Sequence, residues 1–408
     1  MSAGALQKIY FSSPGVFCSA GKNIGELWTS VCAGDNSGIK KIKTLSGKEF
    51  FAARVEDHSL PSADARLNMK IIRMEAAALL QIEDFIFEAK EKYGSERIAV
   101  CVGSCDNGSE LSIAGHKTFF EQGTFPPAYT LEKQCADYVA TFVSEHYGLK
   151  GASLAFTTAC ASSAAAISKA AELIRSGLAD AVVAGGVDIA SDTVLLGFDS
   201  LESVSLQKTN PFSKNRSGIT LGDGAAFFLL SRDNLLKNGL PVILSGSGQS
   251  SDAYHITSPN PDGSGAADAM QKALDNASLR AEDIDYINLH GTGTRLNDSM
   301  EAKAVEKVFG SHRPLCSSTK SETGHTLGAA GALEAAVCWA LIQESAKGSD
   351  KVPIQAWDGE RDPELPELNF ACSGACLKKR VKNCMSNSFA FGGSNSVLIL
   401  SAEDSYAV

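Results

Sequence analysis

The stretch TTACASSAAAISKAAELI, residues 157–174, runs from a polar turn into an alanine-rich helical segment. A second stretch, STKSETGHTLGAAGALEAAVCWALI at residues 318–342, has the same pattern of a polar turn followed by an alanine-rich helical segment. If each follows a strand, both halves of the chain carry a similar strand–turn–helix unit, as an ancient duplication would produce. The alternative is that two alanine-rich helices look alike without common origin. We place the join near the polar segment 231–241 and predict two units, 1–236 and 237–408.

Short apolar runs alternate with longer helical patterns along the chain. Runs typical of buried strands are RIAVCVG (97–103), ASLAFT (152–157), DAVVAGG (180–186), AAFFLL (225–230), VILSGSG (242–248) and SVLIL (396–400). Helical patterns cover 74–94, 162–177 and 265–277. This alternation predicts βαβ units, mainly parallel sheets and the α/β class.

Composition excludes several classes of protein. The 408 residues carry a formal charge of −10, whereas a nucleic-acid binder usually has a basic surface. No apolar run is long enough for a membrane span, and the first residues lack the pattern of a signal peptide. The eleven cysteines include no CxxC motif and match no common zinc spacing. We therefore expect a reduced cytoplasmic protein with no metal site.

Cys160 is either an inert core thiol or a nucleophile. Considered alone, the inert reading is favoured, because free cysteine is among the most buried residue types. Its position, however, is the first turn of a predicted helix, where unpaired N–H groups and the helix dipole favour a thiolate. The neighbours are alanine and serine, which leave room for a substrate.

Two histidines stand at similar turns. His290 ends a predicted strand in INLHGTGTRLNDSMEAKAV (287–305), where α/β sheets bind ligands, and His325 precedes the helix in KSETGHTLGAAGALEAA (320–336). Thr292 and Thr294 offer hydroxyls to a polar ligand. Each histidine alone is more simply explained as satisfying turn carbonyls. Lys320 and Glu334 flank His325 and are expected to pair, directly or through water.

A glycine-rich turn, SNSFAFGGSNS (386–396), precedes the last predicted strand. Its N–H groups are suited to a developing oxyanion. One cysteine and two histidines at strand–helix turns suit acyl transfer through a thioester, with the imidazoles favouring an enolate.

These segments together resemble the signature blocks of the elongating β-ketoacyl-acyl-carrier-protein synthases. The resemblance covers nearly the whole chain and includes NPFSKNRSGITLGDGAA (210–226) and SSDAYHITSPNPDG (250–263). It implies a thiolase-like five-layer αβαβα sandwich built from two similar halves, usually as a homodimer. It also implies decarboxylative Claisen condensation of an acyl group with malonyl-acyl-carrier protein. No cofactor is expected, because phosphopantetheine arrives on the carrier.

The resemblance assigns roles to residues that match the family's motifs. Cys160 matches the acyl-accepting nucleophile, and His290 and His325 match the pair that supports decarboxylation. The other matches are the polar pair Lys320 and Glu334, the oxyanion-hole N–H groups of Cys160 and Phe391, the phosphopantetheine contacts Thr292 and Thr294, and the gate or acyl pocket at Phe389, Phe391, Cys105 and Asp106.

Related subfamilies fit less well. Initiating ketosynthases and chalcone-type synthases carry Asn at the second histidine, thiolases need a second cysteine near the C-terminus, and a chain-length factor lacks the nucleophile. Two departures stand out: Ala390 replaces a frequent hinge glycine, and Asp106 places a carboxyl group near the expected acyl tunnel. A charge there is costly in an apolar tunnel, which suggests a short, polar or polyunsaturated chain, or an Asp106 that faces a dimer partner.

The expected partner is an acyl carrier protein, which needs a basic patch. Candidate cations are Arg66, Lys70, Arg73, Lys208 and Lys214. Each alone is better explained as part of a solvated face. A heterodimer with a related chain is the alternative to a homodimer, and in it this chain would be a low-activity subunit that shapes chain length. Whether the pathway makes fatty acids, a polyene or another polyketide stays open.

Overall fold

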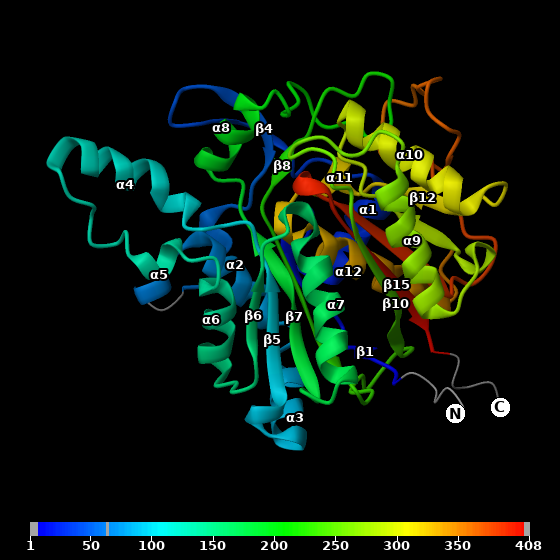
Figure 1. Ribbon diagram of the computed structural model, residues 1–408, viewed down its shortest axis with the longest axis horizontal. Helices are drawn as coiled ribbons and strands as arrows, with labels where there is room; N and C mark the ends of the chain where they lie inside the picture. The colour runs from blue at the N-terminus through cyan, green and yellow to red at the C-terminus, as the bar shows by residue number, and fades with distance from the viewer. Residues whose placement is uncertain (1–6, 63–64, 404–408) are drawn as a thin grey trace.

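The computed structural model describes residues 7–62 and 65–403. Its architecture is a layered α/β sandwich in which sheets alternate with helices (Figure 1). The strands are β1 (Tyr10–Phe11), β2 (Gly15–Cys18), β3 (Lys40–Lys43), β4 (Glu49–Ala53), β5 (Ile98–Gly103), β6 (Ser153–Phe156), β7 (Ala181–Asp188), β8 (Leu221–Gly222), β9 (Gly224–Ser231), β10 (Val242–Ser251), β11 (Tyr286–Asn288), β12 (Leu315–Ser317), β13 (Asn369–Phe370), β14 (Asn383–Phe389) and β15 (Ser394–Ala402). The helices are α1 (Ile24–Ala33), α2 (Lys70–Leu79), α3 (Glu83–Tyr93), α4 (Ser109–Gln122), α5 (Leu131–Gln134), α6 (Tyr138–Tyr147), α7 (Ser162–Arg175), α8 (Asp192–Ser200), α9 (Ser264–Ala277), α10 (Arg295–Phe309), α11 (Lys320–Thr323) and α12 (Ala330–Ala346).

The two halves repeat one sheet topology. In the first half the strand order is β6-β5-β7-β9-β1, and in the second it is β12-β11-β14-β15-β10. In both, the first three strands are parallel and the last two pairings are antiparallel. The stretches 157–174 and 318–342 follow the equivalent strands β6 and β12 and lead into α7 and α12. The duplication that the sequence suggested is therefore present in the fold.

Alternating side chains of the strands divide the core into layers. Along β7, Val182 and Ala184 pack inward against α7 and α12, whereas Val183 and Val187 pack outward against α2 and α6. In the second half, Leu398 and Leu400 face the central helices. Val397 and Ile399 pack against α9 and α10. Helices α7 and α12 thus form the middle of five layers, with α6 and α9 on opposite outer sides in Figure 1.

Two expectations about secondary structure are wrong. The sheets are not mainly parallel, because β9 and β15 turn back antiparallel; β14 and β15 are joined by a tight turn that only an antiparallel pair allows. The single helix predicted over 74–94 is two helices, α2 and α3. Between them the Gln81 side chain bonds to both the N–H and the carbonyl of Val16 in β2, which fixes the chain in a turn.

Among residues 7–62 and 65–403, no helix has the length and the apolar composition that crossing a membrane requires. Strands β12, β11 and β14 lie side by side in one half, and β6 is the edge strand of the other half. The chemically interesting turns follow the ends of these strands.

Candidate active site

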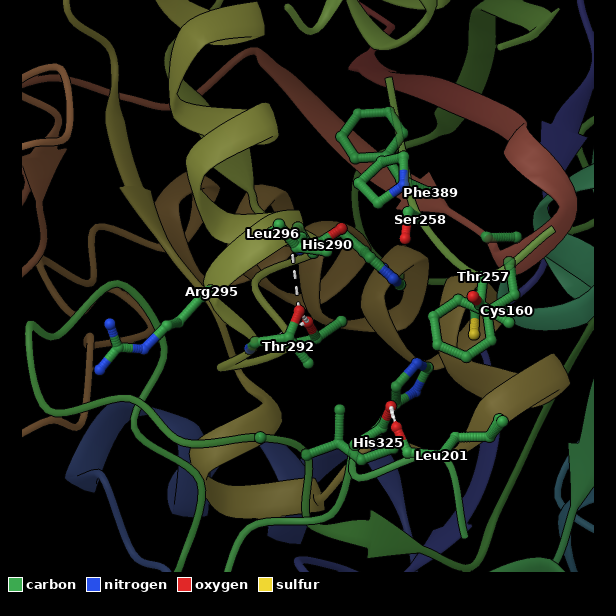
Figure 2. A pocket seen from close by; sticks show the side chains of 18 of the residues that line it. Cys160, Leu201, Thr257, Ser258, His290, Thr292, Arg295, Leu296, His325 and Phe389 are labelled. Carbon is green, nitrogen blue, oxygen red and sulfur yellow. Dashed lines mark hydrogen bonds between the residues drawn. The ribbon is translucent and has the colours of Figure 1, made fainter. Parts of the chain in front are cut away.

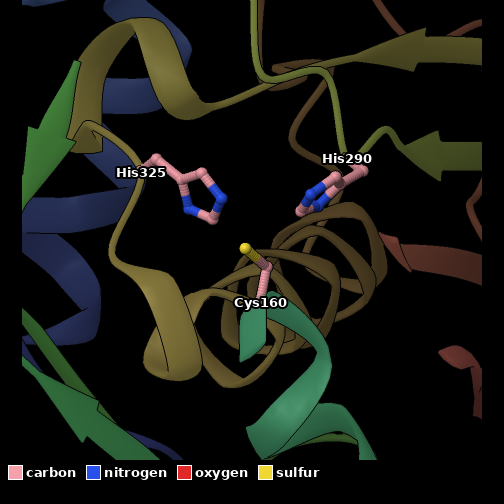
Figure 3. A group of neighbouring side chains, drawn as sticks. All are labelled: Cys160, His290 and His325. Atoms are coloured by element: carbon pink, nitrogen blue, oxygen red, sulfur yellow. The ribbon is translucent and has the colours of Figure 1, made fainter. Parts of the chain in front are cut away.

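Three turns that are far apart in sequence meet above the central helices. Cys160 lies in a 3-10 turn between β6 and α7, His290 follows β11, and His325 follows α11. The sulfur of Cys160 and one ring nitrogen of each histidine all lie within 4.8 Å of one another, and all three residues are buried (Figure 3). The two imidazole rings meet edge to face, with centroids 5.3 Å apart. The structure therefore brings one thiol and two imidazoles to a single point.

The Cys160 thiol is held in a tight, apolar place. Ala159 before it has a positive φ of 48°, and Ala161 and Ala390 pack around it. Burial raises the pKa of the Cys160 thiol to about 12, while the charge of Lys320 and the backbone N–H of Phe391 lower it. Burial therefore opposes the thiolate that the helix start was expected to favour.

We expect the alkylation of Cys160 by iodoacetamide to accelerate by up to about tenfold per pH unit from about pH 6.5 to about pH 9, because only the thiolate reacts. Mass spectrometry of the Cys160 peptide measures the rate, with Cys160→Ala as the blank for the exposed thiols of Cys105, Cys372 and Cys376. A plateau below about pH 7.5 would show that the helix start outweighs burial.

Lys320 supports His290 rather than His325. Its ammonium forms an ion pair with Glu334, donates to the backbone carbonyl of His290 and lies 3.3 Å from His290 Nδ1. Both partners of this ion pair are almost fully buried. Lys320 and Glu334 pair directly, as expected. The hydrogen bonds of Lys320 go to His290, because α11 turns its side chain back toward the end of β11, while its charge also lowers the pKa of His325.

Sequence reasoning missed two acidic residues that hold the His290 turn. Glu301 of α10 accepts the N–H groups of His290 and Gly291, each at 2.8 Å, and Asp298 accepts those of Thr292 and Gly293. Both carboxyl groups are buried. The available signal was their spacing of eight and eleven residues after His290, but in a polar helical segment this looks like a solvated face.

Hydrogen bonds assign the protons of both imidazoles. His325 Nδ1 accepts the N–H of Leu327 at 3.2 Å, and His290 Nδ1 faces the Lys320 ammonium. The proton of each neutral ring therefore sits on Nε2. Burial, and then the charge of Lys320, hold the pKa of both histidines well below the usual value, so both rings are neutral at physiological pH. Two Nε2–H donors suit an oxyanion or enolate, whereas a metal ion would need free lone pairs on these nitrogens.

A cavity of about 420 Å³ opens onto these three residues (Figure 2). Thr292 and Thr294 line it, and their hydroxyl oxygens are 3.0 Å apart. Phe389 and Phe391 line it as well, and the Phe391 ring lies 5.9 Å from that of Phe198 on α8. The histidines, threonines and phenylalanines singled out from the sequence thus surround one space.

Asp106 and Cys105 do not line this cavity. The Asp106 carboxylate is turned into its own loop, where it accepts the N–H of Gly108 at 2.7 Å, the hydroxyl of Ser109 and the phenol of Tyr138 at 2.7 Å. The Cys105 sulfur lies 3.8 Å from Ser162 Oγ. The Asp106 side chain is therefore satisfied within its own loop and does not line this cavity, and its placement near the acyl tunnel stays a prediction.

Ala390 adopts an extended backbone, with φ −115° and ψ 153°, which alanine accepts without strain. The left-handed residues of this turn are Gly392 and Gly393, at φ 83° and 76°. The Ala390 side chain belongs to the apolar cluster around Cys160.

The five candidate docking cations are held by neighbours within the chain. The ion pairs are Arg66 with Glu132 and Glu145, Lys70 with Asp223, Arg73 with Asp57, and Lys214 with Glu360, while Lys208 donates to Asn36. Lys70 lies in a largely enclosed position because Asp223, its partner, is buried. As a set these residues do not present free charge at the cavity.

Two family models match, "Beta-ketoacyl synthase, N-terminal domain" over residues 14–235 and "Beta-ketoacyl synthase, C-terminal domain" over residues 242–347. A curated 3-oxoacyl-[acyl-carrier-protein] synthase 2 of Vibrio cholerae is 32% identical, over 96% of this chain and 98% of that protein. Nodulation protein E of Rhizobium meliloti is 31% identical over the same shares.

Among solved structures, a ketosynthase (ApeO) from Xenorhabdus doucetiae, in complex with its chain length factor (ApeC), superposes with a TM-score of 0.88 at 36% identity. It covers 98% of this chain and 100% of the matched chain.

Proposed function

This chain belongs to the β-ketoacyl synthase family, and on that premise we propose that it condenses an acyl group held on Cys160 with malonyl-acyl-carrier protein. The product is β-ketoacyl-acyl-carrier protein, as in the elongation of fatty acids or polyketides. The chain is an acyltransferase of the ketosynthase type. The observation that carries the proposal is the convergence of one buried thiol and two neutral imidazoles at one cavity.

In the first step the Cys160 sulfur attacks the carbonyl carbon of an acyl thioester on the carrier. The N–H groups of Cys160 and Phe391 stabilise the oxyanion, and the N–H of Phe391 already contacts the thiol. The carrier's sulfur then leaves and takes up the proton that Cys160 lost. Thr292 and Thr294 are suited to contact the phosphopantetheine arm, which the carrier supplies, so the protein needs no cofactor of its own.

In the second step the bond between the malonyl carboxylate and its α-carbon breaks and carbon dioxide leaves. The Nε2–H groups of His290 and His325 donate to the thioester oxygen, which becomes the enolate oxygen. The enolate carbon attacks the acyl carbonyl on Cys160, the C–C bond forms, and the C–S bond breaks to return the thiolate. Neutral imidazoles suit this role because each can donate its Nε2–H hydrogen bond to the enolate oxygen without a change in its own charge.

The experiment that tests the function uses the purified chain, an acylated carrier and malonyl-carrier. We expect the chain mass to rise by one acyl group with the first substrate, and a β-ketoacyl-carrier to form when the second is added. The same reaction across acyl lengths and degrees of unsaturation would identify the pathway. If the chain acylates but never condenses unless a second ketosynthase-like chain is present, the alternative role, a low-activity subunit of a heterodimer, is favoured.

We further propose that the active form pairs this chain with a second chain of the same fold. Helix α4 extends from the body in Figure 1 and, with the following loop, exposes Phe119, Phe120, Phe125 and Leu131. Rings stack along it, Phe119 on Phe125 at 4.7 Å and Phe125 on Tyr129 at 4.6 Å. Strand β6 is the open edge of its sheet, with Leu154 exposed. An apolar arm and an open edge in one half fit a partner chain.

Light scattering tests this pairing. We expect the wild-type chain to be a dimer by itself or with a related chain supplied in equal amount, and Phe120→Asp with Leu131→Asp to be a monomer. Leu178→Asp, at an exposed leucine between α7 and β7, is the matched control and should not change the mass. A wild-type chain that turns over as a monomer would contradict the proposal.

A reducing, cytoplasmic location is proposed as well, since all eleven cysteines are free thiols.

The carrier is proposed to dock on the surface around the cavity mouth. Exposed apolar side chains surround the mouth at Leu201, Leu296 and, beside the lining residue Thr257, Ile256. Arg295 is exposed at the start of α10, and its guanidinium makes no hydrogen bond or ion pair with the part of the chain that the structure describes. In Figure 2 its side chain extends away from Cys160. A phosphate-linked arm and an acidic carrier surface would both be attracted to this cation.

We expect Arg295→Glu to raise the KM for acyl-carrier about tenfold or more, with a much smaller effect on a free acyl thioester, because only the carrier spans this surface. Glu202→Gln, which removes a carboxylate at the same mouth, should lower that KM. Lys214→Glu is the matched control, since Lys214 is exposed but paired with Glu360. Equal KM values for Arg295→Glu and wild type would exclude this docking surface.

A further inference from the structure

Asp188, at the end of β7, is a buried carboxylate with no part in the chemistry described above. Its Oδ2 accepts the N–H of Cys105 at 2.9 Å and that of Gly328 at 2.6 Å, and its Oδ1 accepts the hydroxyl of Ser104 at 3.0 Å. One side chain therefore joins the loop after β5 to the 3-10 turn Leu327–Ala329, although these segments are more than 200 residues apart in the chain.

The loop after β5, the end of β7 and the turn Leu327–Ala329 are closely packed against one another. A Cβ on Gly328 would lie 2.6 Å from Asp188 Oδ2 and 2.9 Å from Ser104 Cα. On the same face of β7, two residues before Asp188, a Cβ on Gly186 would lie 2.7 Å from Ser163 Cβ and 3.1 Å from the Gly328 carbonyl oxygen. The position of Gly328 is thus set by contacts on several sides, and Asp188 supplies its hydrogen bond.

Leu327 connects this junction to the active site. Its φ of 51° lies in the left-handed region, which a branched side chain rarely adopts. That conformation aims its N–H at His325 Nδ1, at 3.2 Å. The next residue, Gly328, is the one whose N–H Asp188 accepts, so the carboxylate holds the peptide that follows the strained residue. Among the described side chains, only that of Asp188 accepts a hydrogen bond from the Gly328 N–H.

We propose that Asp188 is a positioning residue that keeps the proton of His325 on Nε2 by holding the Leu327–Gly328 turn, and that it ties this turn to the Ser104–Cys105 loop. The inference rests on the proposed function, because it concerns the imidazole that polarises the malonyl thioester. Asp188 itself touches no reacting atom. Its effect is on the decarboxylation step rather than on the acylation of Cys160.

The test compares the two half-reactions in Asp188→Asn, which keeps the shape but has only one acceptor oxygen. We expect malonyl-carrier decarboxylation to slow about 10- to 100-fold, while the single-turnover acylation of Cys160 changes less than about threefold. ¹⁵N NMR of histidine-labelled protein should show His325 protonated on Nε2 in the wild type and a mixture of tautomers in the variant. Ser104→Ala, which removes one hydrogen bond and leaves the two N–H bonds, should give a smaller defect in the same step.

The proposal is overturned if Asp188→Asn decarboxylates at the wild-type rate, or if both half-reactions fall together with an unchanged His325 tautomer. If the Asn variant does not fold, Ser104→Ala and the wild type still decide: a selective loss of decarboxylation in Ser104→Ala supports the proposal, and a wild-type His325 that is not protonated on Nε2 contradicts it. Failure of the proposed function itself would appear differently, as a wild-type chain that neither acylates nor decarboxylates.

Discussion

Cys160→Ala is expected to lose condensation activity by about 10⁴-fold or more and to take up no acyl mass from acyl-carrier. The reason is that only Cys160 places a sulfur beside both imidazoles, within 4.8 Å of a nitrogen of each. Intact-mass spectrometry after incubation with acyl-carrier measures the loss directly. The fold should be unaffected, because alanine fits where Ala161 and Ala390 already pack around the thiol.

The matched control for that variant is Cys338→Ala, which removes a buried thiol from α12 away from the cavity lining. It should acylate normally at Cys160. Acyl mass that persists in Cys160→Ala, on any other residue, would remove Cys160 from the role of nucleophile.

His290→Ala and His325→Ala are expected to separate the two half-reactions. Each should slow malonyl-carrier decarboxylation by about 10²- to 10⁴-fold, because a donor to the enolate oxygen is lost from a water-poor site. Acylation of Cys160 should fall far less, since the N–H of Phe391, not an imidazole, contacts the thiol. Release of labelled carbon dioxide and the intact mass of the acylated chain measure the two steps.

The pH dependence of wild-type decarboxylation tests the protonation state of the two histidines. Because burial keeps the pKa of both histidines well below the usual value, wild-type decarboxylation should not fall as the pH rises from about 6 to about 8. A rate that falls as the pH rises through about 6.5 would show that a protonated imidazole is required and would contradict neutral donors. His58→Ala, at an exposed histidine of the 3-10 turn Asp57–Ser59, is the control and should leave both steps unchanged.

Sequence reasoning located the strands well, because apolar runs such as DAVVAGG and AAFFLL fall on β7 and the core of β9. The prediction that ASLAFT is a buried strand is wrong, because β6 is an edge strand and its Ser153 and Leu154 are exposed. It also recognised the repeated strand–turn–helix unit, since α7 and α12 must both be small-residue helices to pack between two sheets. Strand direction was harder. Nothing local in SVLIL distinguishes a strand that returns antiparallel, as β15 does, from one that follows a crossover helix.

The contacts that support the catalytic side chains were the hardest part of the site to predict from the sequence. In the sequence Asp106 looks like an unpaired charge. In the structure it accepts a hydrogen bond from the phenol of Tyr138, which lies 32 residues later in the chain. Lys320 stands next to His325 in the sequence, but its ammonium reaches His290 across the junction of β11 and α11. Asp188 at the end of an apolar strand gives no sign that two distant turns bond to it. Such contacts depend on tertiary packing, which no local pattern encodes.

The central helical layer also affects how the polypeptide is made. The N-terminal half leaves the ribosome first, and in it α7 has β5 and β7 on one side only. Its other side stays bare until α12 has been synthesised, because α12 is the helix that covers it. A nascent chain halted near the middle therefore exposes the apolar face of α7, and we expect it to aggregate more readily than a protein whose first half closes by itself.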